Sequence, residues 1–218
     1  MCFDNGDSRR GWGDGEQRRK KTKTKTKTSR AKEMGGRWPA IKPKKDLQIN
    51  RLRGTLLFTV PNFFSAAEAS AFVEAAEAIG FTHQGSLGPA RGQAYRDNDR
   101  ISITDPLLAE IIWESGLKKI FDDVKLPGEV AVGLNPNIRF YRYTVGQRGK
   151  GNNKDSSAES LVGGETVFYD QRGRVVAEVA PVPGMALLHI HGDDCMLHEA
   201  RVVTKNIKYV LRSDVSFA

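Results

Sequence analysis

The chain has 218 residues, enough for one ordinary domain and a tail. Its net charge of +8 is uneven: residues 1–53 carry 17 Lys/Arg against six Asp/Glu, whereas residues 54–218 carry 17 against 20. The mildly acidic remainder argues against a nucleic-acid-binding surface on the folded part, and two distant cysteines argue against a disulfide framework. No run approaches the roughly 18 apolar residues of a membrane span, and we expect an intracellular protein, cytoplasmic or nuclear, without a secretory signal or membrane partner.

Residues 1–53 are predicted to be a basic, low-complexity tail without fixed structure. Large apolar residues are scarce there, and residues 21–28 are a Lys-Thr repeat that cannot bury a core. The dense positive charge of residues 18–32 is compatible with nuclear import or a weak nucleic-acid contact. A solvated tail without a specific function explains the same composition.

Order is expected to begin at residue 54, with a strand over residues 54–60 and then a helix over residues 66–79. Ser65 is the predicted N-cap of this helix, Glu68 completes a capping box, and Gly80 ends it. The next segment, residues 82–100, is polar and typical of a loop. After it, the amphipathic pattern of residues 105–121 predicts a second helix.

The pattern changes after Pro136 to short alternating segments separated by Gly- and Pro-containing turns. These segments predict strands over residues 138–143, 166–169, 175–179, 185–190 and 208–215. Two helices followed by short strands indicate an α+β domain whose second half is a sandwich or a small barrel.

Three of the four histidines lie within ten residues: His189, His191 and His198. His189 and His191 alternate on a predicted strand and should point the same way. The spacing permits a metal site of the mixed His/carboxylate type, but histidines on strands are more often structural, and the residues alone leave both interpretations open.

Several short motifs occur in a fixed order: Arg-Phe-Tyr-Arg-Tyr-Thr-Val-Gly-Gln, Gly-Gly-Glu-Thr-Val-Phe, Val-Pro-Gly-Met-Ala-Leu-Leu, and the stretch from His198 through Lys208, at residues 139–147, 163–168, 182–188 and 198–214. Together they resemble the prolyl-4-hydroxylase-like branch of the Fe(II)/2-oxoglutarate-dependent dioxygenases. Upstream, residues 61–68 and 97–101 resemble the N-terminal support region of that family. The resemblance implies a helical support layer on a double-stranded β-helix (jelly-roll) core, with the support region over residues 54–134 and the partial core over residues 135–218.

The resemblance also implies a chemistry. Such enzymes use Fe(II), 2-oxoglutarate and, as reductant, ascorbate; they form succinate and hydroxylate a protein or peptide, by default at proline, or another substrate. It implies that His198 is the distal iron ligand, and it assigns no catalytic residue beyond the iron site. The residues implied for the cosubstrate are Lys208 and Tyr143, with pocket-lining roles for Thr166 and Leu188. Each of these four has a structural alternative, a surface lysine at a strand end or an ordinary core residue.

The sequence departs from the family pattern after Gln147, where a His-X-Asp segment should supply the other two iron ligands. Residues 148–160 contain no histidine, and the 15 residues between Gln147 and Gly163 are too few for two strands and a loop. We therefore expect a truncated core and an inactive or impaired oxygenase; the alternative is a non-catalytic binding or regulatory protein. A substitute site of His191, His198 and Asp155 is a weaker hypothesis, because Asp155 lies in a predicted loop, as does the other nearby carboxylate, Glu159.

Overall fold

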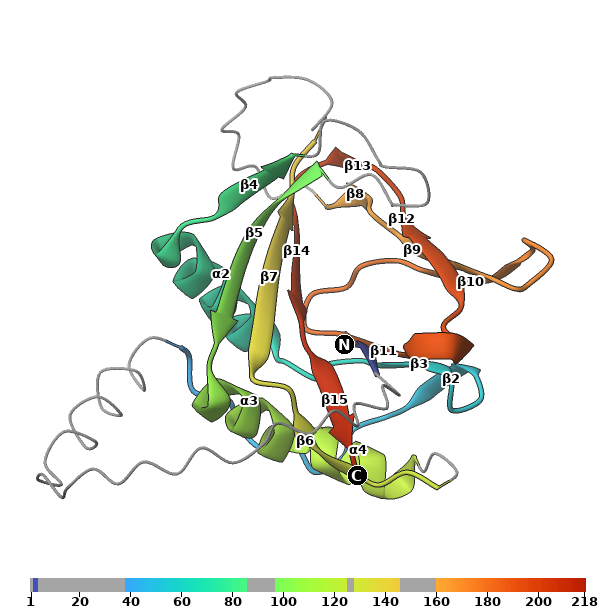
Figure 1. Cartoon of the computed structure of the whole chain (residues 1–218). Helices are drawn as coiled ribbons and strands as arrows, with labels where there is room; N and C mark the ends of the chain where they lie inside the picture. Colours follow the sequence, from blue (N-terminus) through green and yellow to red (C-terminus); the bar gives the residue numbers. More distant parts are fainter. Residues whose placement is uncertain (1, 4–37, 86–96, 125–127, 146–159) are drawn as a thin grey trace, which may run out of the picture.

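The folded unit combines antiparallel β-sheets with a layer of helices (Figure 1). The structure is a computed structural model that describes residues 2–3, 38–85, 97–124, 128–145 and 160–218. This architecture confirms the α+β class. The finer expectation of a double-stranded β-helix core stays a prediction. No helix among the described residues is long and apolar enough to cross a membrane.

The first predicted helix is confirmed as α2 (Ala66–Ile79). The Ser65 side chain accepts a hydrogen bond from the Glu68 backbone N–H, and the Glu68 carboxylate accepts one from the Ser65 backbone N–H. This reciprocal pair satisfies two backbone donors that would otherwise lack a partner at the helix start. At the other end, Gly80 adopts a φ of 89° and ends the helix.

The second predicted helix is divided into two short helices, α3 (Pro106–Ile112) and α4 (Lys118–Asp123), joined by a π-helical turn, Trp113–Leu117. Within that turn, a Cβ atom on Gly116 would lie 2.6 Å from Leu47 Cδ1. Only a glycine therefore lets the preceding segment of the chain pack this closely against the turn.

One sheet has four antiparallel strands in the order β14-β7-β5-β4: Lys208–Arg212, Asn137–Tyr143, Asp97–Thr104 and Thr82–Gly85. Residues 82–85 and 97–100 are strand residues, so the prediction of a loop was wrong for them; residues 86–96 lie outside the described residues. Asp99, a polar residue of β5, is held in the sheet by the Arg142 guanidinium of the neighbouring strand β7, which it binds at 2.8 Å. Alternate positions of the same strand carry the apolar side chains of Ile101 and Ile103.

A second sheet has six strands in the order β2-β3-β11-β1-β15-β6: Asn50–Arg53, Leu57–Val60, Ala186–Ile190, Cys2–Phe3, Asp214–Phe217 and Ala131–Leu134. The short N-terminal strand β1 runs parallel to both of its neighbours, β11 and β15. The other pairings in this sheet are antiparallel.

The remaining strands form two small sheets, β10-β9-β12 (Val175–Val179, Thr166–Tyr169 and Leu197–Ala200) and β13-β8 (Val203–Lys205 and Val162–Gly163). In Figure 1, β5, β7 and β14 stand between α2 on one side and these small sheets on the other.

The main core lies between the helices and one face of the two larger sheets. Phe72 and Ile112 contribute from the helices, Ile138 and Phe140 from β7, and Leu188 from β11. A smaller core of Leu57, Phe168, Val179 and Met196 lies on the other face of β3 and β11, against β9.

The folded unit includes residues 38–53, which corrects the expected start of order at residue 54. Trp38 stacks on Phe140 with ring centroids 4.9 Å apart, and its Nε1 donates to Asp105 at 3.0 Å. A few apolar residues, Trp38, Ile41 and Leu47, pack on the core from a segment that is otherwise rich in lysine. The Lys-Thr repeat lies outside the described residues.

Candidate metal and anion site

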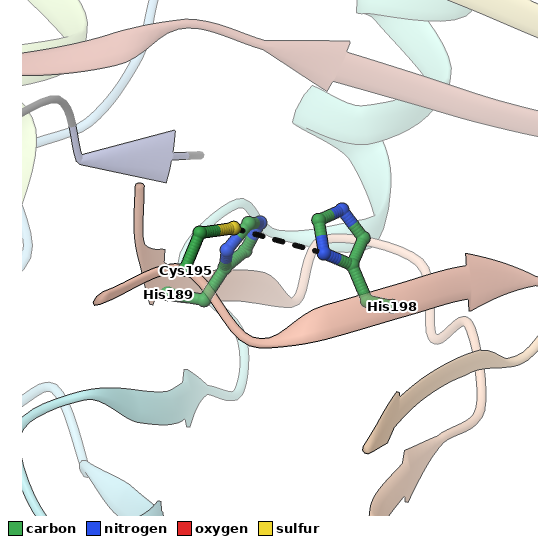
Figure 2. Close-up of side chains that lie close together, drawn as sticks. All are labelled: His189, Cys195 and His198. Atoms are coloured by element: carbon green, nitrogen blue, oxygen red, sulfur yellow. Dashed lines mark hydrogen bonds between the residues drawn. The ribbon is translucent and has the colours of Figure 1, made fainter. Parts of the chain in front are cut away.

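Three side chains with metal-binding atoms converge where β11 ends and β12 begins: His189, Cys195 and His198. One ligand atom from each lies within 4.8 Å of the others, and Cys195 Sγ is 4.0 Å from His198 Nδ1. Figure 2 shows the Cys195 side chain and the two imidazole rings turned toward one another. β11 carries His189, β12 carries His198, and the short connection between the strands carries Cys195.

Backbone carbonyls orient both imidazoles. His189 Nδ1 lies 3.1 Å from the Ile190 carbonyl oxygen, and His198 Nδ1 lies 2.9 Å from that of Met196. Because a carbonyl only accepts hydrogen bonds, Nδ1 carries the proton in each ring and Nε2 has the lone pair. Histidines that bind metals are commonly oriented in this way, by a hydrogen bond from the nitrogen that does not bind the ion.

The environment keeps His189 uncharged. Its ring is buried, and burial lowers its pKa from 6.5 to about 3. Aromatic rings surround it: the centroid of Phe168 is 5.3 Å away and that of His198 is 4.8 Å away. A neutral imidazole is the form that binds a metal ion.

His191 does not join this cluster, although its ring centroid lies 6.5 Å from that of His189. β11 ends at Ile190, and the His191 ring instead accepts a hydrogen bond at Nδ1 from the Gly192 backbone N–H at 3.0 Å. Cys195 takes the place that we expected for His191. The spacing Cys-X-X-His at 195–198 was the signal that could have identified it.

The donor set does not fit the iron centre that the family resemblance implies. That centre needs two histidines and a carboxylate, whereas the cluster offers two imidazoles and a thiol, and no carboxylate of the described residues belongs to it. Asp155 and Glu159 lie outside the described residues.

Lys208 forms a second polar feature, at the start of β14. It is buried, with 8% of its surface exposed, and its Nζ donates to the Gly164 carbonyl oxygen at 2.6 Å. Tyr143 is its cross-strand neighbour on β7, and the ammonium lies 5.7 Å from the centre of that ring. Burial lowers the pKa of Lys208, while the negative charge of Glu165 acts in the opposite direction.

Gly164 is needed for this arrangement. Its φ is +76°, and a Cβ atom there would lie 3.0 Å from Lys208 Cδ and 3.1 Å from Val203 Cγ2. The motif Gly163-Gly-Glu-Thr166 therefore acts through its backbone, as a turn that presents a carbonyl oxygen to the lysine.

Thr166 and Leu188 occupy different environments. Thr166 is half-buried at the start of β9, two residues before Phe168, so both side chains belong to the same face of the strand. Leu188 is fully buried in the main core, on the face of β11 opposite to His189. Such a position is that of an ordinary core residue, which was the alternative to lining a cosubstrate pocket. Leu188 is therefore not included in the proposed ligand site.

Comparison with known proteins gives little beyond this geometry. No family model matches the chain, and no curated protein sequence matches it. Among solved structures, it is similar to the viral collagen prolyl hydroxylase vCPH from Paramecium bursaria Chlorella virus-1, solved as a complex with 2OG. The similarity has a TM-score of 0.47 and 16% sequence identity, and it covers 72% of this chain and 92% of that one. A likeness of this size does not assign a family.

Proposed function

We propose that this protein binds a 2-oxo dicarboxylate, 2-oxoglutarate by the motif resemblance, at Lys208, on an oxygenase-type scaffold that is inactive or impaired as an oxygenase. The observation that carries the proposal is the buried ammonium of Lys208. Among the described residues it has no salt-bridge partner within 4 Å, and a buried charge without a counter-ion is costly. A ligand carboxylate would offset that cost.

Lys208 has the geometry for this role. An ammonium has three N–H donors, and the Gly164 carbonyl accepts from one of them. Either of the others can bind a carboxylate oxygen while the turn at Gly164 holds the side chain in place. Tyr143 and Thr166 are the residues that we propose for the rest of the ligand, Tyr143 beside the ammonium and Thr166 two residues after Gly164.

Isothermal titration with 2-oxoglutarate tests the proposal. We expect Lys208→Gln to weaken binding at least about tenfold, because a charge-assisted hydrogen bond is replaced by a neutral one. The glutamine amide can still donate to Gly164, which preserves the local structure. The matched control is Lys205→Gln, an exposed lysine on the adjacent β13. Equal affinities for the wild type and Lys208→Gln would contradict the proposal.

A second candidate function is the binding of a soft divalent metal at His189, Cys195 and His198. A thiol with two imidazoles favours Zn²⁺ over the iron of a His/carboxylate site. Tetrahedral bonds of about 2.0–2.3 Å place ligand atoms roughly 3.3–3.6 Å apart, so the present spacing requires a contraction of about 1 Å. The convergence of three donor atoms within 4.8 Å favours this function. Because the Cys195 thiol faces His198 Nδ1, which is hydrogen-bonded to the Met196 carbonyl, metal binding through Nε2 also requires the His198 ring to turn.

Cobalt(II) is a spectroscopic probe for such a site. We expect the full chain to bind Co²⁺ with a thiolate-to-cobalt charge-transfer band in the near ultraviolet. The band should persist in Cys2→Ser and disappear in Cys195→Ser, and His198→Ala should weaken Co²⁺ binding by about tenfold or more. A band that survives in Cys195→Ser would show that the cluster is not the metal site.

A further inference from the structure

The four-stranded sheet has one face that the main core does not cover. Along β7, Ile138 and Phe140 point to the core, so Arg139, Tyr141 and Tyr143 point to the opposite side. Cross-strand pairing extends this side, here called the inner face, to both neighbouring strands. Its members on β5 are Arg100 and Ser102, and on β14 they are Lys208, Val210 and Arg212.

The inner face is accessible and cationic. Arg139 and Arg212 lie on adjacent strands within the sheet, yet both side chains are only half-buried. The Nε atoms of Arg100, Arg139 and Arg212 are nevertheless buried, and in the part of the chain that the structure describes none of the three has a hydrogen-bond partner. Unpaired buried donors are uncommon in folded proteins and call for an explanation.

The arginines also repel one another. Arg139 and Arg212 are direct cross-strand partners, an arrangement that is unfavourable for like charges, and Arg100 is diagonal to Arg139. Among the described residues the carboxylate that pairs with this set is Asp214, which binds Arg139 at 2.5 Å. One carboxylate beside three guanidinium groups leaves an excess of positive charge.

The arginine end of the inner face is close to the histidine cluster. In the six-stranded sheet, Cys2 is in register with His189 on one side and with Asp214 on the other. His189 and Asp214, which binds Arg139, are therefore two strand spacings apart, roughly 10 Å.

The same end is too far from Lys208 for one 2-oxoglutarate to reach both. Lys208 and Arg212 are four residues apart on β14, roughly 13 Å at the rise of a strand. The two carboxyl carbons of an extended five-carbon diacid are about 5 Å apart. Contacts with Gly164 and Asp214 hold Lys208 and Arg139 toward opposite ends of the face.

We propose that Arg100, Arg139 and Arg212 form a second anion site, which takes a small molecule with at least two carboxylate or phosphate groups. Guanidinium groups bind both kinds of oxyanion through paired N–H donors, and the unpaired Nε atoms supply such donors. The site does not depend on the binding of 2-oxoglutarate at Lys208.

Two probes test this site in the full-length protein: inorganic pyrophosphate and citrate, which distinguish phosphate from carboxylate recognition. We expect at least one of them to bind by isothermal titration and to raise the melting temperature. Arg212→Gln should weaken that binding about tenfold or more while leaving the melting temperature of the ligand-free protein unchanged or higher, since it removes a repulsion. The tighter of the two probes identifies the oxyanion.

The controls separate this site from the basic tail and from Lys208. Arg172→Gln removes the same charge from an exposed turn and should bind the probes as the wild type does. Lys208→Gln should lose affinity for 2-oxoglutarate but keep its affinity for the probe. Arg212→Gln should keep its affinity for 2-oxoglutarate but lose affinity for the probe. The second site is overturned if neither probe binds, or if Arg212→Gln binds the probes as tightly as Arg172→Gln and the wild type do.

Discussion

At the scale of single residues, Glu68 joins the N-terminal segment to the first helix. Its carboxylate accepts hydrogen bonds from the Lys42 backbone N–H and the Lys44 ammonium at 2.7 Å, and from the Ser65 backbone N–H at 2.8 Å. Burial alone would raise its pKa, but these hydrogen bonds, that of Lys44 foremost, lower it to about 2. The ionised form is therefore strongly preferred in the folded protein.

This preference makes stability depend on pH. A carboxyl whose pKa is lower in the folded state contributes its full stabilisation above the unfolded value of about 4.3 and loses it as the pH falls toward 2. We expect the wild type to lose on the order of 2 kcal/mol more than Glu68→Gln between pH 6 and pH 2.5, measured by urea unfolding. Glu74→Gln, an exposed glutamate of the same helix, should lose as much as the wild type. Equal losses in all three proteins would contradict this account of Glu68.

The same residue shows what the sequence can and cannot predict. The capping box of Ser65 and Glu68 spans three residues, and its pattern was sufficient to predict it. The contact of Glu68 with Lys44 joins residues 24 apart and depends on the tertiary fold. The cluster of His189, Cys195 and His198 was predicted in part for a similar reason. The sequence pointed to the histidines as a possible metal site, but whether His191 or Cys195 completes the cluster depends on the end of β11 at Ile190.

At the scale of elements, the turn before β11 fixes this strand against the helical layer. Gly184 has a φ of +77°, and its carbonyl oxygen accepts a hydrogen bond from the Phe64 backbone N–H at 2.8 Å. A Cβ atom on Gly184 would collide with the Phe64 carbonyl oxygen. The turn thus needs a glycine both for its backbone conformation and for the close approach of another chain segment.

Gly173 provides a matched comparison, because its φ of +73° is similar but no atom lies within 4 Å of the position a Cβ would take. Gly173→Ala should cost about 1–2 kcal/mol, from backbone conformation alone. Gly184→Ala carries the same cost and the collision, and we expect it to be less stable than Gly173→Ala by at least a further 2 kcal/mol or so in thermal or urea unfolding. If the two variants are equally stable, the close packing at Phe64 is not a constraint.

Strands with strong alternation were predicted well, and strands stabilised mainly by their partners were not. The predicted strands at 166–169 and 175–179 coincide with β9 and β10. By contrast, β5 is rich in charged residues, and its strand conformation depends on pairing with β4 and β7 on either side. β1 is only two residues long, and its strand conformation depends on pairing with β11 and β15.

At the scale of the whole molecule, the four-stranded sheet separates two environments. One face packs against the helices and the N-terminal segment, with Trp38 on Phe140. The other carries Lys208 at one end and three arginines at the other, and faces the small sheets that hold His198 (Figure 1). The first face accounts for stability, and the second is where we place ligand binding.

We propose that this scaffold binds 2-oxoglutarate at Lys208 without turning it over efficiently. Saturation-transfer difference NMR reports both properties in one sample that contains the protein, Fe²⁺, ascorbate and 2-oxoglutarate. We predict saturation transfer to the methylene protons of 2-oxoglutarate and no succinate signal above a protein-free control. Succinate that accumulates with the wild type and not with His198→Ala would contradict the claim of impaired activity, and the absence of saturation transfer would contradict the claim of binding.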